Sequence, residues 1–326
     1  MKTALFWEKN NGNIKCNLCH HHCTIPKSST GFCGVRKNIN GELKSLTYGK
    51  AVSSAIDHIE KKPLYHFYPG SNALSIATMG CTLKCHFCQN YEIAQLTGDV
   101  VGEDFPPKEI IKVSNKNNVN TIAWTYTEPT IAYEYFYDTA KLNKKRHVWI
   151  TNGYTEKKPI KKASKYLDAV NIDYKGPEKF YTDLCSGKLK PVQENIKLYK
   201  KLGVWVEVTN LIIPGFNDDK DSIKEMRDFL AKVDENIPLH ISRFMPCYKM
   251  SDVKPTPLKT LKKAYRICKE KLNYVYVGNI PNEHEDTDCH NCNELLIKRS
   301  GFNVTYNNLD KGKCPECDTK IPGVFK

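Results

Sequence analysis

The chain contains 326 residues, of which 40% are hydrophobic and 26% are charged, as is ordinary for a globular protein. That balance excludes an intrinsically disordered chain, and no apolar run approaches the roughly 18 residues that a membrane-spanning helix requires. The first residues lack the apolar stretch of a secretion signal, so we expect a cytoplasmic protein without a membrane partner.

The formal net charge of the chain is +13, and its basic residues are scattered along the sequence in pairs. Lys61-Lys62 and Lys157-Lys158 are examples of these pairs, which are typical of solvated helix faces. Thiolates that bind metal would lower the net charge of the folded protein. The charge by itself therefore does not require a nucleic-acid partner.

The predicted elements divide the chain into three parts: a polar, cysteine-rich region over residues 1–70, alternating strands and helices over 71–280, and a small cysteine-rich tail over 281–326. The predicted strands of the middle part are 74–79, 121–126, 147–151, 169–173, 204–213, 239–244 and 274–278. The predicted helices between them are 107–114, 129–144, 191–202 and 219–233. This alternation indicates βαβ units, and seven strands predict an α/β fold with a partial (β/α) barrel.

Fourteen cysteines are the most informative part of the composition. They fall into a group of four near the N-terminus, a group of three in the middle, a group of four near the C-terminus and three scattered residues. In a long chain without an export signal, closely spaced thiols favour metal ions or iron–sulfur clusters over disulfide bonds. We expect the scattered Cys185, Cys247 and Cys268 to be ordinary thiols, with Cys247 as a candidate site residue because it follows the sixth predicted strand.

The middle group is the sharpest motif, Cys81-x-x-x-Cys85-x-x-Cys88, and it directly follows the first predicted strand of the barrel. A structural zinc ion needs four ligands, and His86 could supply the fourth. A cubane iron–sulfur cluster held by three thiolates instead leaves one iron without a protein ligand, which creates a binding site. Because active sites of parallel barrels lie at the carboxyl ends of the strands, the position of the motif favours the cluster.

The motif resembles the CxxxCx-aromatic-C pattern of radical S-adenosylmethionine (SAM) enzymes, with Phe87 in the aromatic position. Other stretches are similar to the pyruvate formate-lyase-activating branch of that superfamily, and most similar to the radical SAM enzymes of the AmmeMemoRadiSam system. These stretches are residues 62–70 (KPLYHFYPG), 127–130 (TEPT), 151–154 (TNGY) and 171–176 (NIDYKG). The resemblance implies a [4Fe–4S] cluster on Cys81, Cys85 and Cys88 whose open iron binds SAM.

The same resemblance implies an activity. The reduced cluster would cleave SAM to methionine and a 5′-deoxyadenosyl radical, which abstracts hydrogen from a small-molecule or protein substrate that the sequence does not identify. It also implies anaerobic chemistry and an electron donor such as a ferredoxin or flavodoxin. Two alternatives stay open: an activase that installs a glycyl radical on a partner protein, and a basic zinc-ribbon module that binds nucleic acid.

The resemblance further implies that Glu128 binds the cofactor. Glu128 and Pro129 match the end of the family's Gly-Gly-Glu-Pro sequence, although Tyr126 and Thr127 replace the two glycines. The Glu128 carboxylate would accept a hydrogen bond from the ammonium group of SAM. The alternative is a carboxylate that only begins a helix and interacts with its dipole.

Asn152, Asp173 and Lys175 lie at or just beyond predicted strand ends and would face the same mouth of the barrel. Asp173 and Lys175 are two residues apart, hence on one side of an extended segment, and resemble the Asp-x-Lys of activating enzymes, where the pair serves the cofactor site. A surface ion pair is the alternative. His240 and Arg243 are weaker candidates, for which we favour a structural role.

Near the C-terminus, Cys289-x-x-Cys292 and Cys314-x-x-Cys317 form two CxxC pairs separated by a strand-like segment, 302–306. This spacing predicts a zinc-ribbon-like element, because four thiolates close a tetrahedron around one structural ion. A single iron of the rubredoxin type would use the same ligands. We expect zinc at this site.

The N-terminal group is Cys16-x-x-Cys19-x-x-x-Cys23, with nine residues between Cys23 and Cys33. Four thiolates can hold either a zinc ion or a second cubane without an open iron, and the histidines at 20–22 could replace a thiolate. Of these two options we favour zinc, and the second iron–sulfur cluster is the alternative.

Overall fold

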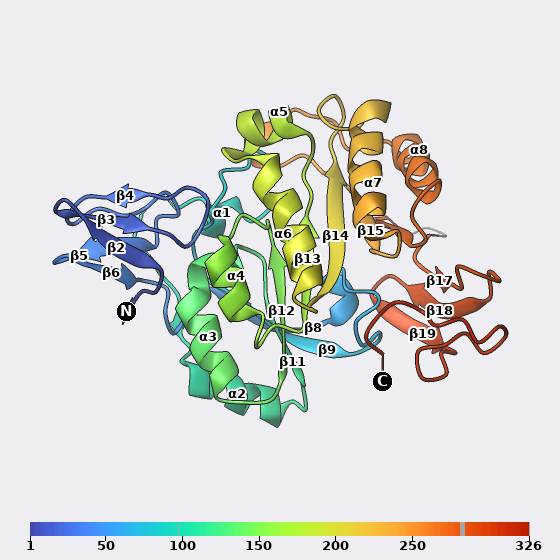
Figure 1. Ribbon diagram of the computed structural model, residues 1–326, viewed down its shortest axis with the longest axis horizontal. Helices are drawn as coiled ribbons and strands as arrows, with labels where there is room; N and C mark the ends of the chain where they lie inside the picture. The colour runs from blue at the N-terminus through green and yellow to red at the C-terminus, as the bar shows by residue number, and fades with distance from the viewer. Residues whose placement is uncertain (97, 281–283, 326) are drawn as a thin grey trace.

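A computed structural model of the protein describes residues 1–96, 98–280 and 284–325. Figure 1 shows three parts side by side: antiparallel strands from the N-terminal segment, a central sheet flanked by helices, and a small C-terminal sheet on the opposite side of the centre. The predicted start of the tail, at residue 281, falls on residues 281–283, which lie outside the described residues.

The strands of the central sheet are β8 (Ser53–His58), β9 (Asn72–Ala77), β11 (Thr121–Trp124), β12 (Arg146–Thr151), β13 (Ala169–Asp173), β14 (Trp205–Ile212), β15 (Leu239–Arg243) and β16 (Val275–Gly278). They lie in the order β16-β15-β14-β13-β12-β11-β9-β8. All strands from β9 to β16 pair in parallel, and each overlaps one predicted strand. The predicted α/β fold with a parallel sheet is therefore confirmed.

Strand β8 has no counterpart among the predicted strands. It lies within the predicted N-terminal region of residues 1–70, yet it pairs antiparallel with β9 along its whole length. Its sequence, SSAIDH, is mostly polar and none of its residues is buried, so it lacks the apolar run by which a strand is recognised. Only the pairing with β9 identifies it as part of the central sheet.

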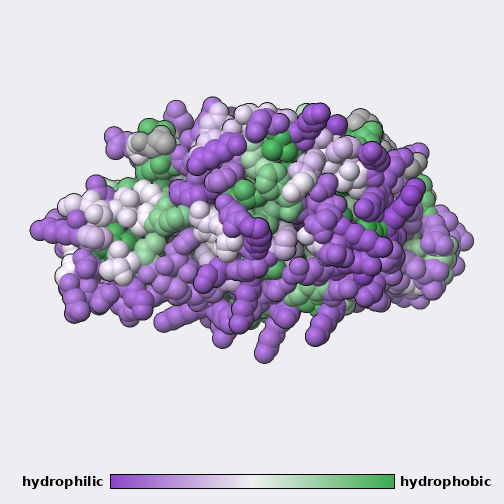
Figure 2. Space-filling view, turned by 90° about the horizontal axis from the view of Figure 1, so that it is seen from above, coloured by the Kyte–Doolittle hydropathy of each residue, from purple (hydrophilic) through white to green (hydrophobic). Residues whose placement is uncertain are grey.

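Six helices of the described chain cover the sheet: α2 (Pro107–Lys116), α3 (Tyr133–Lys141), α4 (Lys157–Ala163), α6 (Leu189–Lys201), α7 (Lys220–Asp234) and α8 (Leu258–Lys269). Each buries residues at helical spacing, as in α7, where Ile223, Met226 and Leu230 are buried. Figure 2 shows the complementary pattern outside, where hydrophilic residues cover most of the visible face. The predicted helix 191–202 begins earlier, at Leu189, whose amide donates to the Glu178 carboxylate.

Shorter helical segments lie in the connections: η1 (Ile59–Lys61), α1 (Tyr91–Ala94), η2 (Pro129–Ala132), α5 (Glu178–Phe180), η3 (Tyr181–Cys185) and η4 (Tyr248–Met250). The predicted helix 129–144 is divided into η2 and α3, and the Glu128 carboxylate accepts a hydrogen bond from the Thr130 amide at its start. No helix among the described residues is both long enough and apolar enough to cross a membrane.

The N-terminal segment forms short antiparallel strands: β1 (Lys2–Thr3), β2 (Trp7–Asn10), β3 (Asn13–Cys16), β4 (Thr24–Ile25), β5 (Arg36–Ile39), β6 (Glu42–Ser45) and β7 (Lys50–Ala51), the last paired with β10 (Glu103–Asp104). The others make two sheets, β1-β6-β5 and β2-β3-β4. The Arg36 guanidinium connects them to α3 through an ion pair with Glu134, with 3.0 Å between Nη1 and Oε2. Because both side chains are buried, this pair anchors the segment to the barrel.

The C-terminal sheet consists of β17 (Thr287–Asp288), β18 (Leu295–Ser300) and β19 (Asn303–Asn307), and β19 overlaps the strand-like segment noted in the sequence. Its apolar face packs against Tyr65, Tyr274 and Tyr276. Arg299 of β18 donates a hydrogen bond from Nη2 to the Tyr65 carbonyl oxygen, at 2.9 Å. The tail is therefore held against the amino-terminal end of the central sheet.

Buried polar groups close the floor of the barrel around Glu207, on β14. Its carboxylate accepts hydrogen bonds from the amides of Tyr65 (2.9 Å) and His66 (2.8 Å), the ring of His240 (2.7 Å) and the indole of Trp205 (2.9 Å). Burial by itself raises the pKa of Glu207, but the bond to His240 and the other donors outweigh it and bring the pKa below its usual value. Residues 62–70 are thereby tied to the sheet as its floor.

We predict that Glu207→Gln lowers the free energy of unfolding by at least about 1.5–3 kcal/mol at pH 7, because the amide loses charged hydrogen bonds and places a donor against other donors. Since the folded-state pKa of Glu207 is lowered, its stabilisation is complete above the unfolded-state pKa and is lost as the pH falls through the folded-state pKa. Denaturant unfolding at pH 7 and at decreasing pH below 4 measures this difference.

The matched control is Glu225→Gln, which changes an exposed carboxylate on α7. Its stability should stay within about 0.5 kcal/mol of wild type. Equal losses in the two variants would show that Glu207 does not hold the floor.

Candidate functional site

The cysteine loop begins at Cys81, four residues after β9, at the carboxyl end of the parallel sheet. Gly80, directly before it, has a φ of +91°, a conformation that glycine adopts far more readily than other residues. A Cβ atom at this position would lie 2.7 Å from the carbonyl oxygen of Cys33 and 2.7 Å from a methyl group of Val35. The loop therefore starts where the N-terminal segment packs directly against the barrel.

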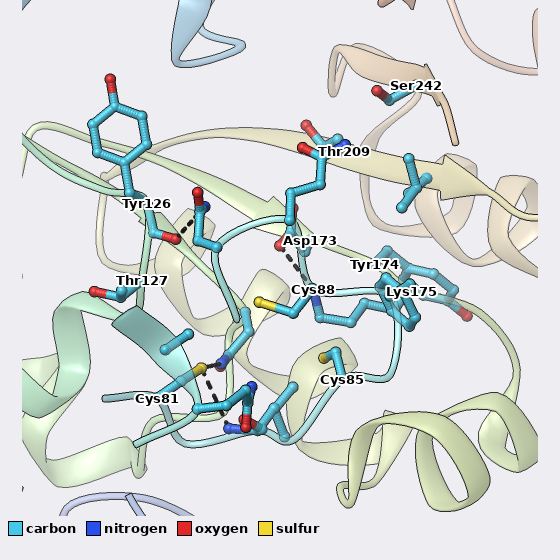
Figure 3. A pocket seen from close by; sticks show the side chains of 18 of the residues that line it. Cys81, Cys85, Cys88, Tyr126, Thr127, Asp173, Tyr174, Lys175, Thr209 and Ser242 are labelled. Carbon is cyan, nitrogen blue, oxygen red and sulfur yellow. Dashed lines mark hydrogen bonds and ion pairs between the residues drawn. The ribbon is translucent and has the colours of Figure 1, made fainter. Parts of the chain in front are cut away.

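Cys81, Cys85 and Cys88 line one cavity at the mouth of the partial barrel (Figure 3). The empty volume of this cavity is about 950 Å³, part of it open to solvent. Each parallel strand from β9 to β16 contributes a lining residue in or after its carboxyl-terminal half. The three thiols thus lie where the strands of a parallel barrel direct their loops.

The spacing of these three sulfur atoms suits a cluster rather than a single ion. Among the described residues, none of the three belongs to a group of three or more potential ligands whose atoms all lie within 4.8 Å of one another, and neither does His86. In a tetrahedral zinc site with bonds of about 2.3 Å, the sulfurs lie about 3.8 Å apart. A cubane distributes its thiolates over separate iron corners, so the residues present fit a [4Fe–4S] cluster with one iron free of protein ligands.

Segment η3 supports the loop from behind. The amides of Lys84 and His86 donate hydrogen bonds of 2.9 Å to the carbonyl oxygens of Cys185 and Leu184. The Cys185 thiol also forms a hydrogen bond with Cys85, and this contact together with burial raises the pKa of Cys85 well above its usual value. A fourth thiol therefore lies in direct contact with the group of three.

The scattered cysteines differ in their positions. Cys247 donates its thiol to the Phe87 carbonyl oxygen, at 3.3 Å, and thus lies beside the loop, as Cys185 does. Cys268 is buried on α8. Sequence reasoning recognised Cys247 as a candidate and missed Cys185, because a lone cysteine far from the motif carries no ligand spacing.

Asp173 and Lys175 form an ion pair inside the cavity, with 2.8 Å between Nζ and Oδ2, and only 11% of the Lys175 side chain is exposed (Figure 3). The ammonium nitrogen lies 5.9 Å from the centre of the Phe87 ring. Burial by itself lowers the pKa of Lys175, but negative charge on Asp173 and Cys85 outweighs it and raises the pKa well above its usual value. The Lys175 ammonium therefore places a positive charge next to the thiols.

Asn152 joins the turn after β12 to the cysteine loop. Its amide nitrogen donates to the Cys81 sulfur at 3.5 Å and to the Thr82 hydroxyl at 2.9 Å, while its carbonyl oxygen accepts from the Tyr154 amide at 3.0 Å. Asn152 also lines the cavity. Hydrogen bonds to a sulfur ligand are among the factors that tune an iron–sulfur cluster.

Glu128 differs from the expectation that it faces the cofactor. It is buried and does not line the cavity, and its carboxylate already has four donors within the protein. These are the amide (3.0 Å) and hydroxyl (2.5 Å) of Thr130, the hydroxyl of Thr151 (2.7 Å) and the amide of Asn152 (2.8 Å). The geometry thus matches the alternative of a carboxylate at a helix start, with the added role of holding the turn that carries Asn152.

The cavity also contains polar residues that sequence reasoning missed: Gln89, Asn90, Thr209, Ser242 and Asn279. The signal that could have found them is their position, because Thr209 and Ser242 lie in the carboxyl-terminal halves of β14 and β15 and Asn279 follows β16. His240 and Arg243 do not line it. His240 belongs to the floor around Glu207, and the side chain of Arg243 donates to the Thr256 carbonyl oxygen.

The four cysteines of the tail form a compact site. Their sulfur atoms all lie within 4.8 Å of one another, with 3.6 Å between Cys289 and Cys317 and 3.6 Å between Cys292 and Cys314. These separations match the edge of about 3.8 Å expected for four thiolates around one zinc ion. The arrangement therefore fits a single tetrahedral metal ion.

The N-terminal cysteines line a second cavity, which lies against the first residues of the cysteine loop: Cys16, Cys19, Cys23 and Cys33. Thr82, the residue after Cys81, lines this cavity as well. Two cysteine-lined cavities thus lie on either side of the start of the loop.

Comparison with known proteins relates the chain to radical SAM proteins. The model of the Radical SAM superfamily matches residues 75–230, which extend from within β9 to within α7. The "Uncharacterized protein MJ0808" of Methanocaldococcus jannaschii is 46% identical over 335 residues, which cover 100% of both chains. The pyruvate formate-lyase-activating enzyme of Clostridium pasteurianum is 23% identical over 216 residues, 59% of this chain and 88% of that protein.

Among solved structures, that of Streptococcus suis SuiB bound to S-adenosylmethionine has a TM-score of 0.51 and 16% sequence identity. The similarity covers 68% of this chain and 53% of that one, so the chain matches about half the length of SuiB. At this level of identity the similarity concerns the fold alone.

We predict that Glu128→Gln lowers the free energy of unfolding by about 1–3 kcal/mol, because the new amide group faces donors such as the Asn152 amide. Thermal or denaturant unfolding of purified protein measures the loss. Glu92→Gln, which changes an exposed carboxylate on α1, is the control and should leave stability unchanged. A Glu128→Gln protein as stable as wild type would contradict the observed hydrogen-bond network.

Proposed function

The chain belongs to the radical SAM superfamily, a superfamily of enzymes, and we propose that it cleaves SAM reductively and abstracts hydrogen from a substrate. The observation that carries this proposal is the convergence of Cys81, Cys85 and Cys88 on one cavity at the carboxyl mouth of the parallel sheet. When bound there, a reduced [4Fe–4S] cluster supplies the single electron that splits SAM into methionine and a 5′-deoxyadenosyl radical.

The residues around the thiols have distinct roles in this proposal. Lys175 supplies a positive charge that offsets the negative charge of three thiolates, and Asp173 fixes its position through their ion pair. Asn152 donates to the Cys81 sulfur, and Glu128 holds the turn that carries Asn152. The Phe87 ring is buried beside the loop, where it excludes water from the thiols.

The substrate would enter through the polar part of the mouth, where Thr209, Ser242 and Asn279 offer hydrogen bonds. We propose a ferredoxin or flavodoxin as electron donor, because the reaction needs one electron of low potential. We also propose that the chain belongs to the AmmeMemoRadiSam system, because residues 62–70 and the three other stretches named above resemble the radical SAM enzymes of that system. Activation of a partner protein by a glycyl radical is a second candidate, favoured by the similarity to the Clostridium pasteurianum activating enzyme.

For the tail we propose a structural zinc ion bound by the four cysteines of the compact site. Separations of 3.6 Å between sulfurs support one tetrahedral ion. Because the C-terminal sheet packs on Tyr65, Tyr274 and Tyr276, the ion would also stabilise the amino-terminal end of the central sheet. A nucleic-acid-binding role for the tail has no support from the contacts that hold it against the barrel.

We predict that Cys81→Ala abolishes 5′-deoxyadenosine formation from SAM under anaerobic, reducing conditions. Cys81 is the most informative of the three ligands to remove, because Cys85 has the Cys185 thiol beside it as a potential substitute. Chromatography of the products measures the loss of 5′-deoxyadenosine. The electron paramagnetic resonance (EPR) spectrum of the reduced protein measures the accompanying loss of the cluster signal.

The control for this experiment is Cys268→Ala, which removes a buried thiol on α8 outside all three cysteine groups. It should retain cleavage activity. SAM cleavage at the wild-type rate in Cys81→Ala would refute the proposed cluster site. If product forms only when a partner protein is added, and the radical is found on that partner, the second candidate function holds.

We also predict that Cys314→Ala lowers the zinc content of the protein by about one ion per chain and reduces its thermal stability, because a structural zinc contributes its binding free energy to folding. Metal analysis by mass spectrometry and thermal unfolding measure both effects. Lys298→Ala, at an exposed position on β18, should change neither. Loss of iron instead of zinc would identify the tail as an iron site.

A further inference from the structure

The N-terminal cysteines come from two parts of the segment that fold together. Cys16 ends β3, Cys19 and Cys23 lie in the connection between β3 and β4, and Cys33 lies in the loop before β5. Cys16 and Cys33 are buried, and the other two are partly buried. All four line a single cavity with an empty volume of about 300 Å³.

The spacing of these sulfurs differs from that in the tail. The structure describes all four residues, yet no three of their sulfur atoms lie within 4.8 Å of one another, whereas all four sulfurs of the tail do. One zinc ion would require separations of about 3.8 Å. Within one chain, therefore, one four-cysteine group is closed around the space of a single ion and the other surrounds a larger gap, as the thiols of a cubane do.

A buried donor without a partner lies at the same cavity. Arg36 lines the cavity and is 1% exposed, and both terminal nitrogens of its guanidinium are occupied by Glu134 and the Leu5 carbonyl oxygen. Its Nε, however, has no hydrogen-bond partner. A buried N–H group normally has an acceptor, and the sulfur atoms of an iron–sulfur cluster accept such bonds.

The cavity also adjoins the proposed catalytic loop. Thr82 lines it, and the His21 ring forms a hydrogen bond of 2.6 Å with the Thr82 carbonyl oxygen. At Gly80, the Cys33 carbonyl oxygen approaches so closely that a Cβ atom would lie only 2.7 Å away. Any group held by the four cysteines is thus separated from Cys81 by little more than the backbone of this loop.

We propose that Cys16, Cys19, Cys23 and Cys33 bind a second [4Fe–4S] cluster rather than the zinc ion favoured from sequence, with Arg36 Nε donating to one of its sulfur atoms. The cluster would take one electron from a low-potential one-electron donor and pass one electron to the group held by Cys81, Cys85 and Cys88, with no bond formed or broken. The site itself rests on a different cysteine set from the proposed function, and only its role as a relay depends on that function.

The first test counts metals in wild-type protein purified anaerobically without added iron or zinc. Two cubanes and one zinc ion predict about eight iron atoms, eight sulfide ions and one zinc ion per chain. About four iron atoms and two zinc ions would overturn the inference. This measurement needs no variant, so it decides the question even if ligand variants are insoluble.

The second test locates the clusters by variants. Cys19→Ala should lose about four iron atoms and keep the zinc ion, and Cys81→Ala should lose a separate four. Cys268→Ala, the matched control, should lose none. Loss of zinc with all iron retained in Cys19→Ala would overturn the inference. Loss of iron in Cys19→Ala but not in Cys81→Ala would support it and refute the proposed catalytic site.

The third test measures proximity. In wild-type protein reduced with dithionite, the EPR signals of two neighbouring clusters should be broadened by their magnetic interaction. Cys19→Ala should give a simpler spectrum from the remaining cluster alone. Identical spectra from wild type and Cys19→Ala would contradict a second reducible cluster beside the loop.

Discussion

At Gly80 the backbone of the N-terminal segment lies so close to the end of the first parallel strand that a side chain has no room there. This contact brings the Cys33 carbonyl oxygen against the residue before Cys81, and Thr82 then faces the N-terminal cysteines. Both cysteine-lined cavities lie beside this contact, because Cys81 lines one and Cys33 and Thr82 line the other. The cysteine loop is thus enclosed between the barrel mouth and the N-terminal sheets instead of lying open on the surface.

Three buried carboxylates hold the segments around this arrangement. Glu134 pairs with Arg36 and accepts from the Leu5 amide, so it anchors the N-terminal sheets. Glu128 holds the turn after β12, and Glu207 holds the floor. Each accepts hydrogen bonds from main-chain amides of a loop, and together with their other donors these offset the cost of burying the charge. The loops are therefore fixed by polar contacts inside a barrel that apolar packing assembles.

The two groups of four cysteines differ in how far apart the fold holds their sulfur atoms. In the tail, two turns at the ends of short strands bring Cys289, Cys292, Cys314 and Cys317 within the space of one ion. In the N-terminal segment, two sheets and Arg36 keep the sulfurs further apart around a cavity. Along the chain the tail has two CxxC pairs with 21 residues between them, whereas the N-terminal group has three closely spaced cysteines followed by Cys33. Four thiolates with either spacing can hold a zinc ion, so only the folded structure separates the two groups, by the distances between their sulfurs.

The sequence by itself determined the parallel strands, the cysteine motif and its place after the first of them, because apolar periodicity and ligand spacing are local properties of the chain. It also placed Asp173, Lys175 and Asn152 correctly at the carboxyl end of the sheet, since the carboxyl ends of parallel strands share one edge.

Only the tertiary structure decided which way side chains point and which distant segments meet. Glu128 lies at the expected strand end, yet its carboxylate accepts four hydrogen bonds inside the protein and does not line the cavity. Cys185 contacts Cys85 although 100 residues separate them, and the polar strand β8 exists only through its pairing with β9. Such contacts depend on how packed elements approach one another in space, and no local pattern in the chain encodes that approach.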